Sequence, residues 1–280
     1  MSSVLFDVPG PRARARHRIG TVVAGLALAA VGAWVLWVLW DKEQITPDKW
    51  EAFTEPTIIT FLLEGLLATL TAAAVAVVLA IVFGAVLASG RLSDHASVRW
   101  PSIVVIEFFR AVPLLLLILF LFLGFADILG LFWALVIGLV LYNGSVLAEI
   151  FRAGVLSVPK GQSEAAYAVG MRKSQVMRLI LAPQALRSML PAIISQCVVA
   201  LKDTALGYII GAPGIVRDAE RIYIAPQYNN PLAVGIVLMA IFIVINYSLS
   251  KLAVYLESRL RRQGKTVVKV GAATDQVPAG

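Results

Sequence analysis

Two pairs of opposite charges stand inside otherwise apolar stretches of this 280-residue sequence. Glu107 lies three residues before Arg110, and Glu149 lies three residues before Arg152, so in a helix the members of each pair share a face. An ionisable group in such a stretch costs about 2.5–3.5 kcal/mol on membrane-insertion scales, and it usually lines a cavity or pairs with another charge. The spacing therefore predicts either ion pairs within helices or a polar route between them.

Two interpretations of these charges are open. As parts of a route for a charged or zwitterionic solute, Arg110 and Lys202 would attract carboxylates. Glu107, Glu149 or Asp203 would attract an ammonium group. As structural groups, the charges would form ion pairs that fix the helices, which we favour for the two three-residue pairs. Both interpretations stay open for the adjacent Lys202 and Asp203. The full set of candidate route residues is Glu107, Arg110, Asn143, Glu149, Lys202, Asp203 and Thr204.

The composition places these charges in an integral membrane protein. Hydrophobic residues make up 59% of the sequence and charged residues 15%, whereas soluble domains are about half apolar and about one quarter charged. The net charge of +7 does not indicate a nucleic-acid partner, because the basic residues lie mostly between and beside the apolar segments. One cysteine and two isolated histidines exclude an intrachain disulfide and a Cys/His metal cluster.

The apolar segments predict an all-α fold with six transmembrane helices. About 20 apolar residues are enough to cross the hydrocarbon core of a bilayer. The first segment has this length and ends in tryptophans rather than a cleavage site, so we expect it to be retained as a span. The predicted spans are Ile19–Trp40, Thr57–Ser89, Pro101–Phe125, Leu129–Phe151, Ala185–Ile210 and Pro231–Leu256.

The distribution of lysine and arginine predicts that both termini face the cytoplasm. The tail at 1–18 is basic, the connection at 41–57 is acidic, and the long connection at about 152–187 is basic. The C-terminal tail at 261–280 is basic at its start and then small and polar, so we expect it to be cytoplasmic and disordered.

The long connection contains a patterned stretch, "SEAAYAVGMRKSQVMRLILAP". Ser163 is a residue that can cap the start of a helix, and Glu164 then lies near the helix N-terminus, where negative charge is favoured. Gly170 can end this helix in a left-handed conformation. A second helix should follow and end or kink at Pro183. From the residues alone, a plain connector and a docking site for a partner are equally open.

The same stretch resembles the EAA loop of ABC importer permeases, in which Glu-Ala-Ala is followed by a glycine and then by Ile-x-Leu-Pro. Ala182 stands where the family usually has leucine. The resemblance implies that the first short helix docks in a cleft of an ATP-hydrolysing subunit. The residues to which this docking role is carried over are Gly161, Glu164, Ala165, Ala166, Gly170, Ile180 and Pro183.

Further segments are similar to those of permeases for polar amino acids, most of all the actinobacterial glutamate type. They are "FFRAVPLLLL", "AEIFRAGVLSVPKGQSEAA" and "LKDTAL". The resemblance implies a type I importer permease domain at 57–260, with a core of five helices, preceded by an extra span at 19–40. It also implies uptake of a polar amino acid by alternating access, with glutamate the leading solute and glutamine or aspartate as alternatives.

The resemblance also implies partners in a bacterial plasma membrane. These are two ATPase subunits, a second permease subunit (identical or homologous), an extracytoplasmic solute-binding protein and the lipid bilayer. ATP and Mg²⁺ would bind to the ATPase subunits, because the triplet at Gly264 lacks the earlier glycine of a phosphate-binding loop and has Arg259 in its place. The chain would then be a non-catalytic subunit. The alternatives are a secondary transporter driven by an ion gradient and a membrane scaffold or sensor.

Overall fold

The computed structural model describes residues 10–228 and 230–263, and every regular element in those residues is a helix, as predicted. The predicted tails at 1–18 and 261–280 are only partly covered, because 1–9 and 264–280 lie outside the described residues. The elements are α1 (Pro11–Asp41), η1 (Pro47–Thr54), α2 (Pro56–Arg91), α3 (Ala96–Ala111), α4 (Leu114–Leu156), α5 (Lys160–Ala168), α6 (Lys173–Gln175), the π-helical turn η2 (Val176–Leu181), α7 (Ala182–Asp203), η3 (Thr204–Ile210), α8 (Ile215–Ile224) and α9 (Pro231–Gln263).

Five helical stretches within the described residues are long and apolar enough to cross a bilayer. They are Ala15–Asp41, Pro56–Arg91, Leu114–Leu156, Lys173–Ile210 and Pro231–Leu252. The sequence predicted six spans, and the difference arises at α4. This helix is 43 residues long, much longer than one crossing requires, and it is interrupted by non-helical backbone at Gly130.

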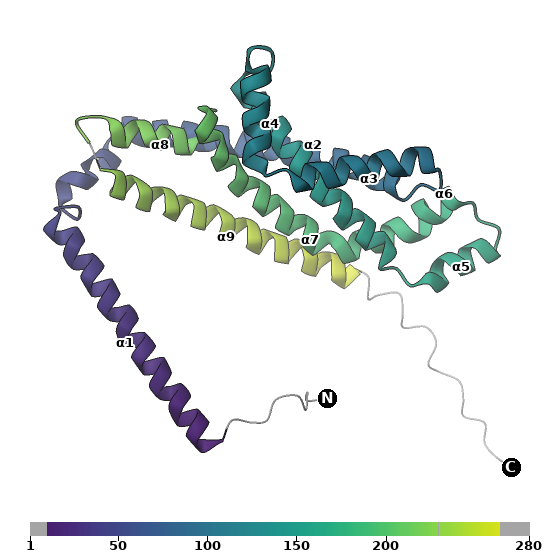
Figure 1. Ribbon diagram of the computed structural model, residues 1–280, viewed down its shortest axis with the longest axis horizontal. Coiled ribbons are helices and arrows are strands. Elements are labelled where there is room, and N and C mark those ends of the chain that lie inside the picture. Colours follow the sequence, from purple (N-terminus) through teal and green to yellow (C-terminus); the bar gives the residue numbers. More distant parts are fainter. Residues whose placement is uncertain (1–9, 229, 264–280) are drawn as a thin grey trace.

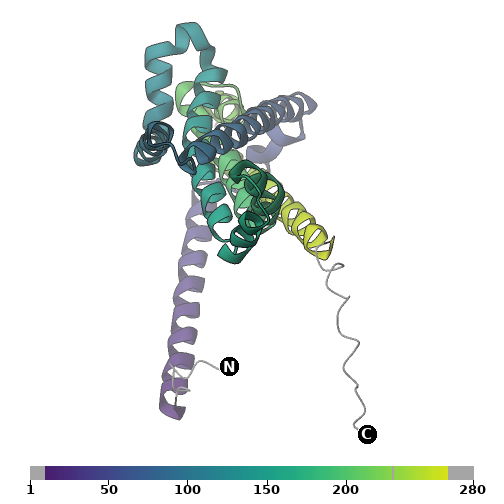
Figure 2. The same ribbon diagram turned by 90° about the vertical axis from the view of Figure 1, so that its right-hand side faces the viewer.

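The α4 helix is a hairpin of two limbs, 114–129 and 131–156. Gly130 has φ 72° and ψ 165°, a conformation that glycine adopts far more easily than other residues, and it reverses the chain there. Figures 1 and 2 show the limbs side by side. They are in close contact, because a Cβ atom added at Gly138 would lie 2.8 Å from Cγ1 of Ile118. The second limb begins after Gly130, close to the predicted start at Leu129.

The predicted third span, Pro101–Phe125, is wrong as a single helix. It is divided at Val112 and Pro113 into the 16-residue α3 and the first limb of α4. Val112 is extended, with φ −78° and ψ 127°. The ring of Pro113 disfavours helical backbone at the preceding residue, which explains why α3 ends at Ala111.

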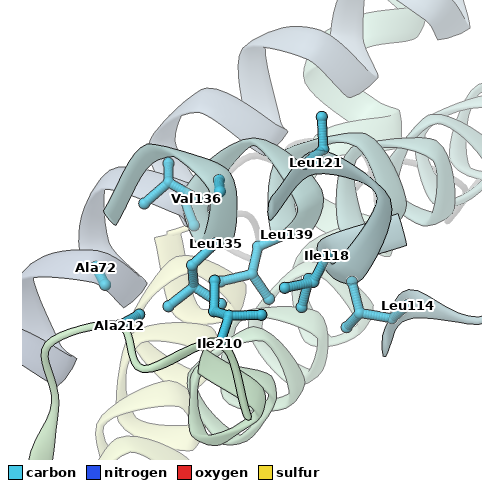
Figure 3. Packing of buried hydrophobic residues seen from close by; sticks show 11 residues of the cluster. Ala72, Leu114, Ile118, Leu121, Leu135, Val136, Leu139, Ile210 and Ala212 are labelled. Carbon is cyan, nitrogen blue, oxygen red and sulfur yellow. The ribbon is translucent and has the colours of Figure 1, made fainter. Parts of the chain in front are cut away.

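The main apolar core lies where the two limbs of α4 pack against α2 and the segment after α7. Figure 3 shows Ile118 and Leu121 of the first limb near Leu135 and Leu139 of the second. Small residues of α2 allow close approach of the helices, since a Cβ atom at Gly84 would lie 2.7 Å from the carbonyl oxygen of Gly144. This packing gives the charged residues of α2 and α4 fixed relative positions.

The bundle has two distinct ends. Figure 1 shows α5, α6 and the turn between α2 and α3 at one end, and η1, α8 and the start of α9 at the other. The α1 helix extends away from the bundle (Figure 1). None of the residues in the most apolar part of its candidate span, Ala15–Asp41, is buried. Its tryptophans Trp34, Trp37 and Trp40 are exposed near the end that leads to η1.

Candidate functional site

The short helix α5 projects from the bundle and ends in a glycine turn. Gly170 has φ +82°, which confirms the left-handed conformation predicted for it. Its N–H donates to the carbonyl oxygen of Tyr167 at 2.9 Å, and the N–H of Met171 donates to that of Ala166 at 3.1 Å. These two bonds form a Schellman motif, which satisfies the last carbonyl groups of α5. The chain direction after α5 is therefore set locally.

The start of α5 differs from the prediction. The helix begins at Lys160, and its N-cap is Pro159, with no side-chain cap. Ser163 lies inside the helix, where its hydroxyl donates to the carbonyl oxygen of Lys160 at 2.8 Å. The prediction that Ser163 caps the helix is therefore wrong, because the chain turns into the helix earlier, after Pro159. Glu164 consequently lies in the second turn, where it is exposed.

One face of α5 lies against the bundle and the other faces outward. Ala166 is buried, and α5 packs against the π-helical turn η2, whose Val176 is completely buried. Gly161, Glu164 and Ala165 are exposed. The exposed residues thus face away from the bundle, and the small side chain of Ala166 permits close packing behind them.

For the second helix of the loop, the prediction was that Pro183 would end or kink it, and only the first outcome is contradicted. The three-residue α6 is followed by the π-helical turn η2 and directly by α7, so the helical path does not end at Pro183. In a regular α-helix the ring of Pro183 would clash with the carbonyl group of Leu179. The wider π-helical turn accommodates this proline. Ile180 and Ala182 are half-buried beside it.

Long side chains connect the loop to the membrane helices. Nζ of Lys173 lies 2.5 Å from Oδ1 of Asp94, in the turn between α2 and α3, and it also donates to the carbonyl oxygen of Leu92 at 3.2 Å. Nε2 of Gln184 on α7 donates to Oε1 of Gln162 on α5 at 3.4 Å. The Lys173 ammonium lowers the pKa of the Asp94 carboxyl. Side-chain contacts therefore connect α6 to the turn after α2, and α5 to α7.

Arg91 joins three helices near the same end of the bundle. Its Nη1 lies 2.7 Å from Oε1 of Glu149 on α4 and 3.0 Å from Oε1 of Glu107 on α3. The side chains of Arg91 and Glu149 are only 17% and 19% exposed. Arg91 was not among the predicted site residues. An arginine at the end of an apolar run is also what is expected where a membrane span ends at the bilayer surface, so the sequence does not distinguish the two roles.

Both of the three-residue pairs are present and extend this ion-pair network. Nη1 of Arg110 lies 3.6 Å from Oε2 of Glu107, and Nε of Arg152 lies 3.1 Å from Oε2 of Glu149. We call the connected residues the arginine–glutamate network: Arg91, Glu107, Arg110, Glu149 and Arg152. It has one more positive than negative charge, and it holds α2, α3 and α4 together.

A separate polar cluster lies between the second limb of α4 and α7. The buried Asn143 accepts a hydrogen bond from Nε2 of Gln196 at 2.6 Å, and its Nδ2 donates to the carbonyl oxygen of Leu139 at 3.1 Å. The Asn143 side chain also lies close to the carboxyl group of Asp203. The structure thus brings together Asn143 and Asp203, and it adds Gln196, which the sequence analysis did not single out.

The remaining two candidate route residues have different environments. Lys202 is exposed, whereas Asp203 beside it is half-buried, as expected for neighbours whose side chains point in different directions. Thr204 is buried, and its hydroxyl donates to the carbonyl oxygen of Leu201 at 2.6 Å, which satisfies it within its own turn. Lys202 is therefore the candidate of this group that is open to a ligand.

A comparison with protein families matches residues 76–262 to the family described as "binding-protein-dependent transport system inner membrane component". The matched region includes the C-terminal part of α2, the EAA-like loop and the arginine–glutamate network. Within the described residues, no group of three or more His, Cys, Asp or Glu side chains could hold a metal ion.

Individual relatives cover most of the chain. The glutamate transport system permease protein GluD of Corynebacterium glutamicum is 46% identical over 243 residues, which are 83% of this chain and 88% of that protein. The glutamate/aspartate import permease protein GltK of Escherichia coli O6:H1 is 35% identical over 214 residues, 72% of this chain and 94% of that protein. A crystal structure of an amino acid ABC transporter with histidines matches with a TM-score of 0.67 and 30% identity, covering 72% of this chain and 94% of that one.

Proposed function

The chain belongs to the family of binding-protein-dependent transport system inner membrane components, as the permease subunit of an ABC amino acid importer, and we propose that it carries glutamate. The strongest support for glutamate is the 46% identity to the glutamate permease GluD over most of both chains. Aspartate and glutamine are the nearest alternatives, since both have the same backbone charges and a polar side chain of similar size.

The proposed topology has six spans, with both termini in the cytoplasm. The spans are α1, α2, the two limbs of α4, the helical stretch Lys173–Ile210 and α9. The second limb of α4, at 131–156, is long enough to cross the hydrocarbon core, and the first is about 24 Å long. The basic connection that contains α5 is then cytoplasmic, in agreement with the positive-inside rule. The α1 helix is the extra span that precedes the five-span core.

The proposed coupling site is the exposed face of α5 and the turn after it. Glu164 and Ala165 are exposed there, and the apolar side chains of Tyr167 and Val169 are 49% and 78% exposed. Burial of such apolar area against a cleft of an ATPase subunit would favour docking. Closure of two ATPase subunits around ATP and Mg²⁺ would then move α5, and the contacts of Lys173 and Gln184 would transmit the motion to α2 and α7.

The proposed solute route runs past the end of α7. Lys202 is exposed and can attract a carboxylate, and the nearby cluster of Asn143, Gln196 and Asp203 offers polar groups at the depth of the spans. The four charged residues of the three-residue pairs serve instead in ion pairs within α3 and within α4, and Arg91 of α2 joins the two glutamates. A second permease subunit, identical or homologous, would complete the route, and a solute-binding protein would deliver the amino acid at the outer face.

Reconstitution tests this function directly. The chain is placed in proteoliposomes with its ATPase subunits, second permease and binding protein, and uptake of radiolabelled glutamate, aspartate and glutamine is measured. We expect ATP-dependent glutamate uptake that persists with an ionophore. Glu164→Arg should abolish uptake while the complex remains membrane-inserted, and Arg18→Gln on exposed α1 is the matched control. Uptake that collapses with the ionophore, or that survives Glu164→Arg, would contradict the proposal.

A further inference from the structure

A groove of about 630 Å³ lies beside the coupling loop (α5, α6 and η2), and the function proposed above assigns no ligand to it. It is formed by the ends of α2 and α4 on one side and by α6, η2 and the start of α7 on the other. Its walls are mainly apolar and come from Leu92, Phe151, Val155, Met177, Leu186 and Met189. Long methionine and leucine side chains of this kind adapt their shape to a flexible apolar ligand.

The mouth of the groove is polar, and together with the neighbouring Arg99 it has two cationic side chains, Arg99 and Lys173, for one carboxylate. Asp94, His95 and Lys173 lie there together with Ser93 and Ser174. Lys173, His95 and Arg99 all act on the Asp94 carboxyl, and their charges lower its pKa. The Asp94 carboxylate is therefore surrounded by the basic side chains of Lys173, His95 and Arg99. The electrostatic potential at the mouth then favours an anion.

The mouth also lies at the level where lipid headgroups are expected. Trp100 is 61% exposed near the start of α3, directly after Arg99, and exposed tryptophan beside basic residues is typical of the membrane–water interface. From Leu92 at the mouth, the wall continues along α2 to Ala85, about 10 Å deeper at 1.5 Å per residue. The groove thus leads from headgroup depth into the hydrocarbon layer.

We propose that this groove binds an anionic phospholipid of the cytoplasmic leaflet, with one acyl chain along the apolar walls and the phosphate at Lys173 and His95. The cytoplasmic leaflet contains anionic lipids, which attract basic residues near the membrane surface. The assignment of the leaflet rests on the proposed topology. One wall of the groove belongs to the membrane helices α2 and α4, and the other belongs to the coupling loop and the start of α7. A bound lipid would therefore contact both the coupling loop and the helices to which the motion of the ATPase subunits is transmitted.

Native mass spectrometry of the assembled importer tests the site. The complex is released from nanodiscs that contain equal amounts of phosphatidylglycerol and phosphatidylcholine, and the retained lipids are counted. We expect the wild-type complex to retain phosphatidylglycerol preferentially. Lys173→Gln together with His95→Gln should remove the preference, whereas Asp94→Asn should keep or increase it because it frees Lys173. An unchanged preference in the double variant would overturn the proposal.

A second pair of variants tests the apolar part of the groove. Ala85 is exposed on the groove wall, so Ala85→Phe fills the groove without disturbing the buried core, and it should reduce lipid retention. Ala24→Phe makes the same change on exposed α1 and should leave retention unchanged. Equal retention in both variants would contradict the site. ATP-dependent glutamate uptake measured on the same samples separates a failure of this proposal from a failure of the transport function.

Photocrosslinking identifies the occupant itself. The single cysteine is removed as Cys197→Ser, Met177→Cys is introduced in the groove wall, and a benzophenone maleimide is attached and irradiated in the assembled complex. An adduct with the mass of phosphatidylglycerol supports the proposal. An adduct with the ATPase subunit, or with the second permease, shows that a protein fills the groove and overturns it.

Discussion

Lys173 of the coupling loop lies 2.5 Å from Asp94 of the turn between α2 and α3, so an ion pair joins two segments that are 79 residues apart in the sequence. If this pair transmits motion, Lys173→Glu should reduce glutamate uptake severalfold while ATP hydrolysis continues. Asp94→Lys combined with Lys173→Glu should restore uptake, because the pair is rebuilt with reversed charges. A double variant no better than the single one would show that the pair has no coupling role.

The same pair predicts a specific pH dependence. The pKa of Asp94 is lowered by Lys173, so the contact contributes stability above the unfolded pKa of about 3.9 and loses it as the pH falls through the folded pKa. Spin labels at Ser93→Cys and Ser174→Cys, in a Cys197→Ser background, report the distance across the contact. We expect one narrow distribution between about pH 5 and pH 8, and broadening only in more acidic solution or at high salt. Broadening near neutral pH would contradict this assignment.

The sequence predicted the features that depend on local chemistry. An all-α fold, the exposed α5 and the left-handed Gly170 follow from apolar runs and turn residues that lie close together in the chain. The bounds of the third span were wrong, because an apolar run continues across Val112 and Pro113 while the backbone there is extended. Local pattern was correct for the turn at Gly170, but not for the helix cap predicted at Ser163 or for the helix break at Pro113.

Contacts between distant segments could not be predicted in the same way. Arg91 lies 58 residues from Glu149, and Asn143 lies 53 residues from Gln196. These contacts depend on which helices become neighbours, and a single sequence does not encode that choice in any local spacing. The three-residue pairs could be predicted because both members of each pair lie on one helix face. The contacts through which Arg91 joins the two pairs could not be predicted.

Gly170 should resist substitution. Its φ of +82° costs other residues about 1–2 kcal/mol, so Gly170→Ala should loosen the turn after α5 and reduce uptake. Gly170→Asn should have a smaller effect, because asparagine tolerates the left-handed conformation better than alanine does. Limited proteolysis of the loop and ATP-dependent uptake measure the two effects. Gly25→Ala on α1 is the matched control, since Gly25 has open space around it and ordinary φ; equal loss in both alanine variants would contradict the explanation.

Arg91 should matter more for stability than Arg110. Arg91→Gln leaves the Glu149 carboxylate, which is only 19% exposed, without its partner on α2, and we expect a loss of about 1–3 kcal/mol. Arg110 is 40% exposed and contacts Glu107 at 3.6 Å, so Arg110→Gln should cost about 0–1 kcal/mol. Thermal unfolding of the purified complex compares the two variants. Adding Glu149→Gln to Arg91→Gln should recover part of the loss, because the half-buried carboxylate that keeps Arg152 but has lost Arg91 is then replaced by a neutral amide.

The hydrogen bond between Gln196 and Asn143 tests whether the polar cluster is structural or part of the route. In a double-mutant cycle with Asn143→Ala and Gln196→Ala, thermal unfolding should show a coupling energy of about 0.6 kcal/mol and at most about 1.7 kcal/mol, the range for hydrogen bonds between membrane helices. If the cluster also contacts the solute, the variants should alter the discrimination between glutamate and glutamine, whereas a purely structural bond lowers uptake of both amino acids by the same factor. Lys202→Gln should lower glutamate uptake more than glutamine uptake, because its exposed ammonium interacts more strongly with the additional carboxylate.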